Sequence, residues 1–358
     1  MTAVNRQPFV AALGIETPII QAPMAGVQDY RLAAAVSNAG GLGSLPCAML
    51  GPDALKAELE ALNEATHGRP YNLNFFAHTP PNPDDQQEAR WRQALAPYYK
   101  ECAIDPATIS NGPGRMPFND ESAAIVEAFR PAVVSFHFGL PEPALLDRVR
   151  QAGAKILSTA TTVEEAIWLE QHGADAVIAQ GLEAGGHRGI FLTKDMTTQM
   201  GTFALLPQIV GAVNIPVIAA GGIATAEGVQ AALKLGAVAA QIGTAFMLCP
   251  EATTRPLHRQ ALKSPQARHT ALTNLFSGGP ARGIVNRTMR ELGPISDLAP
   301  AFPLATNAIA PLRAAAEAAG SGDFSPLWSG QNVSGCREVS AGELVKVLAP
   351  KASLEAPQ

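Results

Sequence analysis

Short apolar segments recur along the chain, each followed by a glycine-containing turn and a helical pattern, and they constrain the fold most. Several are hydrophobic along nearly their whole length, which is typical of strands buried on both faces of a parallel sheet. The eight segments are residues 17–23, 41–45, 71–76, 132–138, 155–160, 176–180, 216–222 and 237–244. Alternating strand–helix units of this number predict an α/β fold, a closed (β/α)8 TIM barrel, rather than an open doubly wound sheet.

The segments between these strands have helical patterns. The expected helices cover residues 30–38, 54–66, 143–152, 163–172, 202–213 and 225–235. The last has clear boundary residues, because Thr225 can cap its start and Gly236 can end it.

The spacing between strands is uneven in two places. Residues 77–131 form a long insertion after the third strand, and residues 181–215 form another after the sixth. Active sites of such barrels are built from the loops that follow the strands, so both insertions are expected to overhang the site. We assign residues 1–250 to the barrel and residues 251–358 to a C-terminal helical segment that closes the substrate pocket.

Composition excludes several classes of function. The formal net charge is −5 and the basic residues are scattered, so nucleic-acid binding is not expected. The four cysteines form no C-x-x-C pair, which predicts a reduced protein without disulfides or a metal site. No signal peptide or membrane-spanning apolar run is recognised, so we expect a cytoplasmic protein without a membrane partner. The oligomeric state is left open.

The sixth strand runs directly into a polar, glycine-rich loop, AVIAQGLEAGGHRGIF, at residues 176–191. Glycines let the backbone adopt positive φ values and approach a ligand closely, and a histidine in such a loop can exchange a proton near neutral pH. We therefore predict a catalytic role for His187. The alternative is that Glu183, His187 and Arg188 form an ion-pair cluster that only stabilises the loop.

Glycines also follow the seventh and eighth strands, in AAGGIA (219–224) and QIGTAF (241–246). Exposed N–H groups at such turns, with the positive end of a helix dipole, bind phosphate, and barrels often hold phosphate at this place. The candidate phosphate-binding residues are Gly221, Gly222, Gly243 and Thr244. The alternative is that these glycines only form tight turns.

The first strand ends in QAPMAGV (21–27), where small residues and Pro23 can lie flat against a planar ring and Met24 can pack on it. Asn74 and Gln180 are amides at or near strand ends, where they can bond the polar atoms of a ring, because buried amides need partners. An ordinary turn with a core methionine, and ordered water beside the amides, are the competing interpretations.

Other histidines have less informative surroundings. His137 lies between aromatic residues in SFHFG, so a core position and an active-site role fit it equally well. His78 also falls near a strand end. His258 and His269 are expected at the surface.

Together these motifs resemble those of the class I nitronate monooxygenases, formerly called 2-nitropropane dioxygenases. QAPMAGV, AAAVSNAGGLGSL, NLNFF, SFHFG, AQGLEAGGHRG, AAGGIA, QIGTAF and ARGIVNR occur in the order seen in that family, over roughly residues 9–290. The resemblance implies an FMN-containing barrel that oxidises alkyl nitronates or nitroalkanes with O2 to a carbonyl compound and nitrite.

The resemblance also implies roles for particular residues. FMN contacts would fall on Ala22, Pro23, Met24, Asn74, Gln180, Gly185, Gly221, Gly222, Gln241, Gly243 and Thr244. The family's catalytic histidine falls on His187 and a second active-site histidine on His137. When protonated, His187 would orient a nitronate, and when neutral it would remove the α-proton of a nitroalkane.

The chain departs from the family at the substrate pocket, which well-studied relatives line with tyrosines and a lysine. The segment at residues 298–309 has no tyrosine, and Asn307 stands where the lysine is expected. We therefore expect a more apolar and less cationic pocket wall. Small anionic nitronates such as propionate 3-nitronate would then not be the preferred substrates.

Three other functions compete with this one. An FMN-dependent NAD(P)H reductase of a quinone or an enoyl thioester would use the same barrel and the same cofactor contacts. A metal-free isomerase or aldolase of phosphate sugars would be colourless and would usually have a lysine at a strand end, which none of the eight strands has. A flavin carrier would bind FMN without turnover.

Overall fold

The computed structural model describes residues 7–109, 112 and 115–350 of the chain. The ends of the two predicted domains, at residues 1–6 and 351–358, and residues 110–111 and 113–114 of the predicted insertion lie outside the described residues.

Parallel strands of the described residues form one eight-stranded sheet, in the order β1-β9-β8-β6-β5-β4-β3-β2. They are β1 (Ile19–Gln21), β2 (Gly43–Pro46), β3 (Tyr71–Phe76), β4 (Val133–His137), β5 (Lys155–Ala160), β6 (Ala176–Gln180), β8 (Val217–Ala220) and β9 (Ala239–Ile242). A parallel bridge between Ile20 and Leu42 joins the two ends of the sheet. The predicted barrel is thus confirmed, and each predicted strand overlaps an observed one.

The barrel interior is filled by branched apolar side chains from several of its strands. Leu157, Ile178 and Ile218 belong to this cluster and are at most 2% exposed. Helix α1 (Gln7–Ala12) adds Phe9 to it. Since the interior is packed, a ligand can enter only at the mouth formed by the strand ends.

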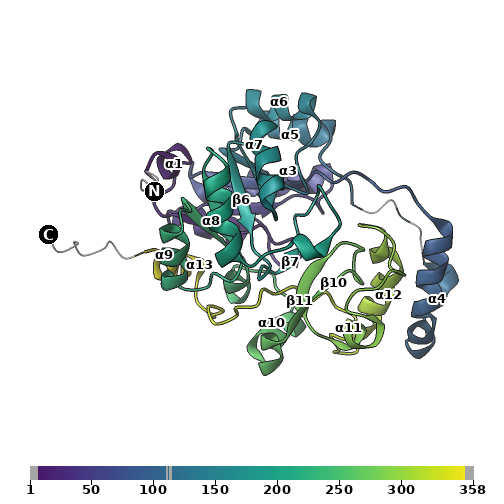
Figure 1. Cartoon of the computed structure of the whole chain (residues 1–358). Coiled ribbons are helices and arrows are strands. Elements are labelled where there is room, and N and C mark those ends of the chain that lie inside the picture. Colours follow the sequence, from purple (N-terminus) through teal and green to yellow (C-terminus); the bar gives the residue numbers. More distant parts are fainter. Residues whose placement is uncertain (1–6, 110–111, 113–114, 351–358) are drawn as a thin grey trace.

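Helices surround the barrel, and all but the last of them lie between successive strands of the chain (Figure 1). They are α2 (Tyr30–Asn38), α3 (Pro52–Thr66), α5 (Asp120–Phe129), α6 (Pro143–Gln151), α7 (Val163–Gln171), α8 (Thr202–Ala212), α9 (Ala226–Lys234) and α13 (Ala341–Leu348). Thr225 caps α9 as predicted, because its side chain accepts a hydrogen bond from Gly228 N. Helix α13 packs between α2 and α9, burying Leu344 and Val345 beside β9.

A second lobe lies beside the barrel mouth and contains much of the chain between β9 and α13 (Figure 1). Its helices are α4 (Asp85–Glu101), α10 (Pro256–Lys263), α11 (Arg287–Leu292) and α12 (Ala305–Ala318). Short 3₁₀ helices are η1 (Pro106–Thr108), η2 (Met196–Thr198), η3 (Thr244–Leu248) and η4 (Pro265–Arg268). The strands β10 (Thr270–Thr273), β11 (Ala281–Ile284) and β7 (Gly186–His187) form an antiparallel sheet.

This arrangement corrects the purely helical expectation for residues 251–358. That segment includes β10 and β11, and its last helix covers the barrel rather than the pocket. The sequence of β11, ARGI, does not show the apolar pattern of a buried strand, because it contains an arginine. Arg282 is nevertheless buried, and its guanidinium donates a hydrogen bond to Leu182 O. The domain boundaries themselves stay a prediction.

The insertion after β3 attaches to the second lobe through α4, which packs against α12. Trp91 Nε1 donates to Ala305 O, and Tyr99 Oη donates to Ala308 O at 2.7 Å.

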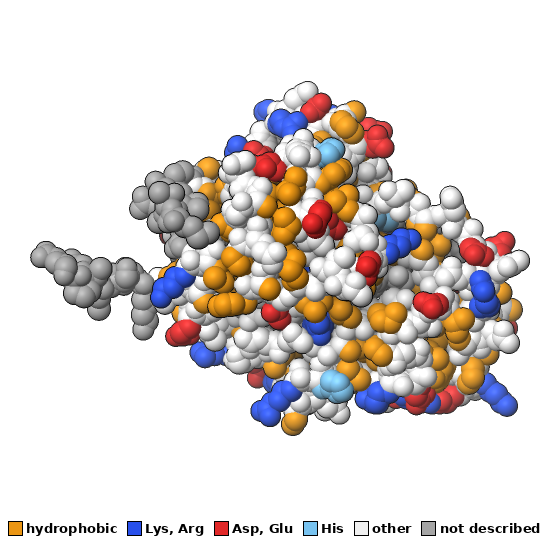
Figure 2. All heavy atoms as spheres, viewed as in Figure 1, with side chains coloured by type: hydrophobic (Ala, Val, Ile, Leu, Met, Phe, Trp, Pro, Cys, Tyr) orange, Lys and Arg blue, Asp and Glu red, His pale blue; other side chains and the backbone are white. Residues whose placement is uncertain are grey.

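On the face of the molecule in Figure 2, basic and acidic side chains are interspersed. None of the helices in the described part of the chain is long and apolar enough to cross a membrane.

Candidate active site

A cavity opens at the carboxyl ends of the barrel strands, and every candidate site residue from the sequence lines it. These residues are Ala22, Pro23, Met24, Asn74, His137, Gln180, Gly185, His187, Gly221, Gly222, Gln241, Gly243 and Thr244. They come from loops far apart in the chain that the barrel brings to one end. Their individual roles remain predictions.

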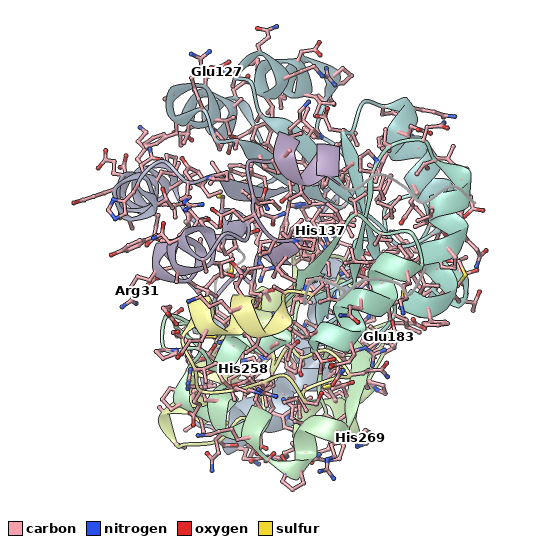
Figure 3. The ribbon with its side chains drawn as sticks, turned by 90° about the vertical axis from the view of Figure 1, so that its left-hand side faces the viewer. Arg31, Glu127, His137, Glu183, His258 and His269 are labelled. Atoms are coloured by element: carbon pink, nitrogen blue, oxygen red, sulfur yellow. The ribbon has the colours of Figure 1, made fainter. Side chains whose placement is uncertain are left out.

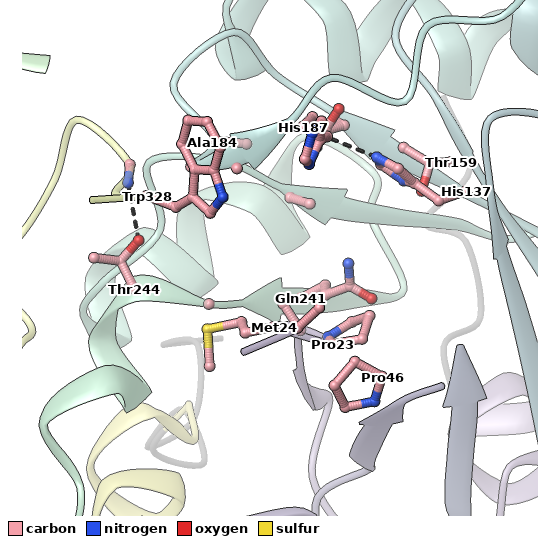
Figure 4. Close-up of a pocket in the computed structure, with 18 of the residues that line it drawn as sticks. Pro23, Met24, Pro46, His137, Thr159, Ala184, His187, Gln241, Thr244 and Trp328 are labelled. Atoms are coloured by element: carbon pink, nitrogen blue, oxygen red, sulfur yellow. Dashed lines mark hydrogen bonds between the residues drawn. The ribbon is translucent and has the colours of Figure 1, made fainter. Parts of the chain in front are cut away.

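The cavity has two distinct sides (Figure 4). Pro23, Met24 and Gln241 lie on one side, and His187 and His137 lie opposite them. The first side is fixed by an amide network, in which Gln28 Oε1 accepts from Met24 N at 2.9 Å. An apolar floor of this kind suits a flat ring.

Neighbouring strands and side chains hold the glycine-rich loop that carries His187. Strand β7 pairs with β11, so that His187 lies opposite Ala281. Gln180 Nε2 donates to His187 O at 2.9 Å, and Gln180 Oε1 accepts from Gly189 N at 2.8 Å. The Gln180 amide therefore bonds the loop, and its predicted contact with a flavin remains a prediction.

Arg188 is fully buried and stabilises the same loop without an ion pair among the described residues. Its guanidinium donates to Gln180 O and Gly181 O, each at 2.6 Å, and to Gln199 Oε1. Glu183 is bonded instead to the N and Oγ1 of Thr202. The ion-pair cluster considered for Glu183, His187 and Arg188 is therefore not how the loop is stabilised.

Aromatic rings surround the His187 imidazole. The ring centroids of Phe302, Trp328, Phe138 and Phe76 lie 5.2, 5.5, 6.2 and 6.4 Å from that of His187. Burial lowers the pKa of His187 well below its ordinary value, and a nearby arginine charge lowers it further. The imidazole is therefore neutral near pH 7.

In the described part of the chain, the side chain of Ser277 orients the His187 ring. Its Nε2 lies 2.8 Å from Ser277 Oγ, and this hydroxyl lies 3.4 Å from Gly279 O. If Nε2–H donates to Ser277 and Ser277 donates onward to Gly279 O, the lone pair of Nδ1 stays free to accept a proton. Sequence reasoning missed Ser277, which lies about ninety residues beyond the loop.

His137 contacts the same loop. Its Nε2 lies 3.1 Å from His187 O, and since a carbonyl only accepts, Nε2 carries the proton. Nδ1 then accepts from Thr159 Oγ1 at 3.0 Å. Burial lowers the pKa of His137 to about 4. With both ring nitrogens bonded, His137 holds the His187 backbone, and its predicted direct contact with the substrate stays a prediction.

A C-terminal strap, residues 324–332, closes one end of the cavity, where the sequence predicted closure by a helical segment. Gly330 N donates to Thr244 Oγ1 at 2.9 Å (Figure 4). Asn332 Nδ2 donates to Gly222 O at 2.9 Å. The strap thereby joins both predicted phosphate-binding turns. The large apolar side chain of Trp328, in FSPLWSGQN, is the sequence feature that could have indicated a buried position for this segment.

His258 is buried, so the prediction that it lies at the surface was wrong. It lies in the second lobe, away from His137 (Figure 3). Its Nε2 donates to Trp328 O at 3.0 Å, and burial lowers its pKa to about 4. His258 therefore fixes the strap from behind. His269 is exposed, as expected.

The cavity wall also contains an unexpected cation, Arg115, from the insertion after β3. Its guanidinium carbon lies 5.9 Å from the ring centroid of Phe76 and 5.7 Å from that of Phe302. This corrects the expectation of a less cationic wall. Asn307 at the lysine position instead donates to Gly112 O, so the charge comes from a different element.

The residues present fit a planar heterocycle that carries a phosphate. Gln241 Oε1 is buried without a hydrogen-bond partner among the described residues and can accept from a ring N–H. Gly221 and Gly222 have φ values of +115° and +71°, which favour glycine and leave the backbone open to a ligand. A Cβ on Gly185 would lie 2.5 Å from the strap backbone.

Comparison with known proteins identifies the family. The family model described as nitronate monooxygenase matches residues 6–351. The chain belongs to the nitronate monooxygenase family. Its members are flavin-dependent oxidoreductases, so both the family resemblance and the prediction of a flavin-dependent enzyme are confirmed.

Relatives of this nitronate monooxygenase family member match over nearly its whole length. It is 41% identical to the nitronate monooxygenase of Pseudomonas aeruginosa, covering 95% of this chain and 97% of that one. Among solved structures, nitroalkane oxidase from Streptomyces ansochromogenes matches with a TM-score of 0.86 and 42% identity, covering 95% of this chain and 96% of that one. FabK from Thermotoga maritima has a TM-score of 0.69 and 26% identity, covering 95% and 94%.

Proposed function

We propose that this family member uses FMN and O2 to oxidise alkyl nitronates to a carbonyl compound and nitrite. The observation that carries the proposal is the cavity, where glycine turns, an apolar floor and a neutral histidine meet at the barrel mouth. A nitronate monooxygenase and a nitroalkane oxidase among its relatives support the substrate class.

FMN fits the two sides of the cavity. The ring would lie on Pro23 and Met24 with Gln241 at its edge, and the phosphate would lie at the turns after β8 and β9, near Gly222 and Thr244. When bound, FMN would supply the redox chemistry by taking electrons from the substrate and passing them to O2.

His187 has the state needed for a base. Because it is neutral near pH 7, it would accept the α-proton of a nitroalkane at Nδ1 while Ser277 holds Nε2. A nitronate has already lost that proton and needs no base. The surrounding rings of Phe302 and Trp328 limit the access of water to the bound substrate.

The decisive experiment is anaerobic mixing of the purified flavoprotein with a panel of nitronates. Rapid bleaching of the flavin absorption by at least one nitronate, followed by nitrite release when oxygen is admitted, is the expected result. Failure of every nitronate to reduce the flavin would contradict the proposal.

A reductase that uses NAD(P)H is the second candidate, because it would use the same barrel and the same cavity residues. Anaerobic NAD(P)H should leave the flavin oxidised if the first proposal holds. Bleaching by NAD(P)H, with no response to nitronates, would select the reductase.

A further inference from the structure

Arg115 gives the cavity its charge. Among the described residues that line the cavity, it is the one lysine or arginine, and no aspartate or glutamate is present there. Burial lowers the pKa of Arg115, with Arg313 adding to the effect, and no described carboxylate pairs with its guanidinium. A desolvated cation without a carboxylate partner is costly unless an anion completes the site.

A buried histidine positions Arg115. His78 Nε2 lies 3.1 Å from Arg115 O and must donate to it, because a carbonyl only accepts. Nδ1 of His78 is therefore unprotonated, and it is buried without a partner among the described residues. Burial lowers the pKa of His78, so it adds no second positive charge beside Arg115.

Arg115 lies on the same side of the cavity as His187. Both contact the rings of Phe76 and Phe302, and the charge of Arg115 lowers the pKa of His187. The proposed phosphate turns are bonded instead to the strap, through Gly330 and Asn332. The cation is thus placed for a substrate rather than for the cofactor phosphate.

We propose that Arg115 binds the negative charge of an anionic substrate, with His78 as its positioning residue. This inference rests on the proposed function, since a nitronate is the anionic form of a nitroalkane. A neutral His187 supplies no positive charge of its own. Arg115 therefore favours binding of the anionic nitronate over binding of the neutral nitroalkane.

Removal of the Arg115 side chain should change KM and kcat differently. Removal of electrons from the nitronate neutralises the negative charge that it carries mainly on its two oxygens, so Arg115 stabilises the bound nitronate at least as well as the transition state. Removing such an interaction raises KM without lowering kcat.

The test uses the holoenzyme of the wild type, Arg115→Met, Arg115→Lys and Arg290→Met. The last is the matched control, because Arg290 is an exposed cation on α11 outside the cavity lining. For ethyl nitronate, Arg115→Met should raise KM at least about tenfold at unchanged or higher kcat. Arg115→Lys should recover part of the loss, and Arg290→Met should behave as wild type.

The test is extended by a neutral substrate, nitroethane, and by a further variant, His78→Phe. The KM for nitroethane should be the same in all four proteins, because the neutral substrate does not need the cation. His78→Phe keeps a ring but loses the bond to Arg115 O, so it should raise the nitronate KM by a smaller factor and leave nitroethane unaffected. Equal rises for both substrates would contradict the positioning role.

Nitrite gives a readout without turnover, because its binding perturbs the absorption of an adjacent flavin. Arg115→Met should raise the nitrite Kd at least about tenfold, and Arg290→Met should leave it unchanged. An unchanged nitronate KM together with an unchanged nitrite Kd overturns the inference. If no nitronate reduces the wild-type flavin, the proposed function fails, while the nitrite Kd still decides whether Arg115 binds anions.

Discussion

Buried neutral imidazoles hold much of this site together. His137 donates to the carbonyl of His187, and His258 donates to the carbonyl of Trp328, which lies on the opposite end of the cavity. Each bond needs only one ring N–H, which a neutral imidazole provides without the cost of burying a charge. The same residues therefore make the fold sensitive to acid.

Acid should lower the free energy of unfolding in a defined pH range. The unfolded histidines bind protons near pH 6.5, whereas His137 and His258 in the folded state do so only near pH 4. The unfolded state thus binds more protons, and stability falls as the pH drops through this interval, by about 1.4 kcal/mol per histidine and pH unit. Urea denaturation between pH 7 and pH 4.5 measures it. His137→Gln and His258→Gln should flatten the dependence, and His269→Gln should not.

His187 is expected to matter more for nitroalkanes than for nitronates. His187→Asn removes the base, so kcat/KM for nitroethane should fall by roughly 10²- to 10⁴-fold, while ethyl nitronate loses less because its α-proton is already gone. Oxygen consumption with each substrate measures both values. Equal losses on the two substrates would argue for a positioning role only.

Among the elements, the glycine-rich loop and the strap depend on close backbone contact. Gly185→Ala would place a Cβ 2.5 Å from Gly330 N, so the strap must move away from the loop. We expect weaker flavin binding, measured as the flavin-to-protein ratio after dialysis. The control is Gly211→Ala in α8, where an added Cβ meets nothing within 4 Å. Full flavin retention in Gly185→Ala would contradict the expectation.

The loop also depends on Arg188. Arg188→Met removes hydrogen bonds to two buried carbonyl groups and leaves them unpaired, which should cost roughly 2–4 kcal/mol of stability. Thermal unfolding of the variant measures this loss. Arg188→Lys keeps the charge but cannot reach both carbonyls in the same geometry, so a full rescue by lysine would show that charge alone matters.

At the scale of the molecule, α4 joins the insertion to the second lobe. Trp91 is fully buried between α4 and α12, so Trp91→Ala should destabilise the protein by roughly 3–5 kcal/mol. A lower Tm is the measured quantity. Trp91→Phe keeps most of the apolar volume and should lose less, and equal losses would indicate that the bond to Ala305 O dominates.

The barrel could be predicted because its strands are continuous apolar runs, and the predicted site residues follow those strands directly. Sequence reasoning failed where placement depends on distant packing. Arg115 reaches the cavity, and Ser277 reaches His187, only because α4, α12 and the small sheet fold over the mouth. Strand β7 has two residues, which are too few to show the alternating pattern of a strand. The strap lies about ninety residues beyond the eighth strand, so its contact with the turn after that strand is not evident in the sequence.

The chain leaves the barrel after β9 and returns only with α13, having built the second lobe and the strap in between. A ribosome that makes this protein therefore delivers the barrel strands first and the residues that finish the cavity last. A nascent chain ending before Asn332 has a barrel without its strap. The cavity that the strap closes is therefore complete only when synthesis of the chain is nearly finished.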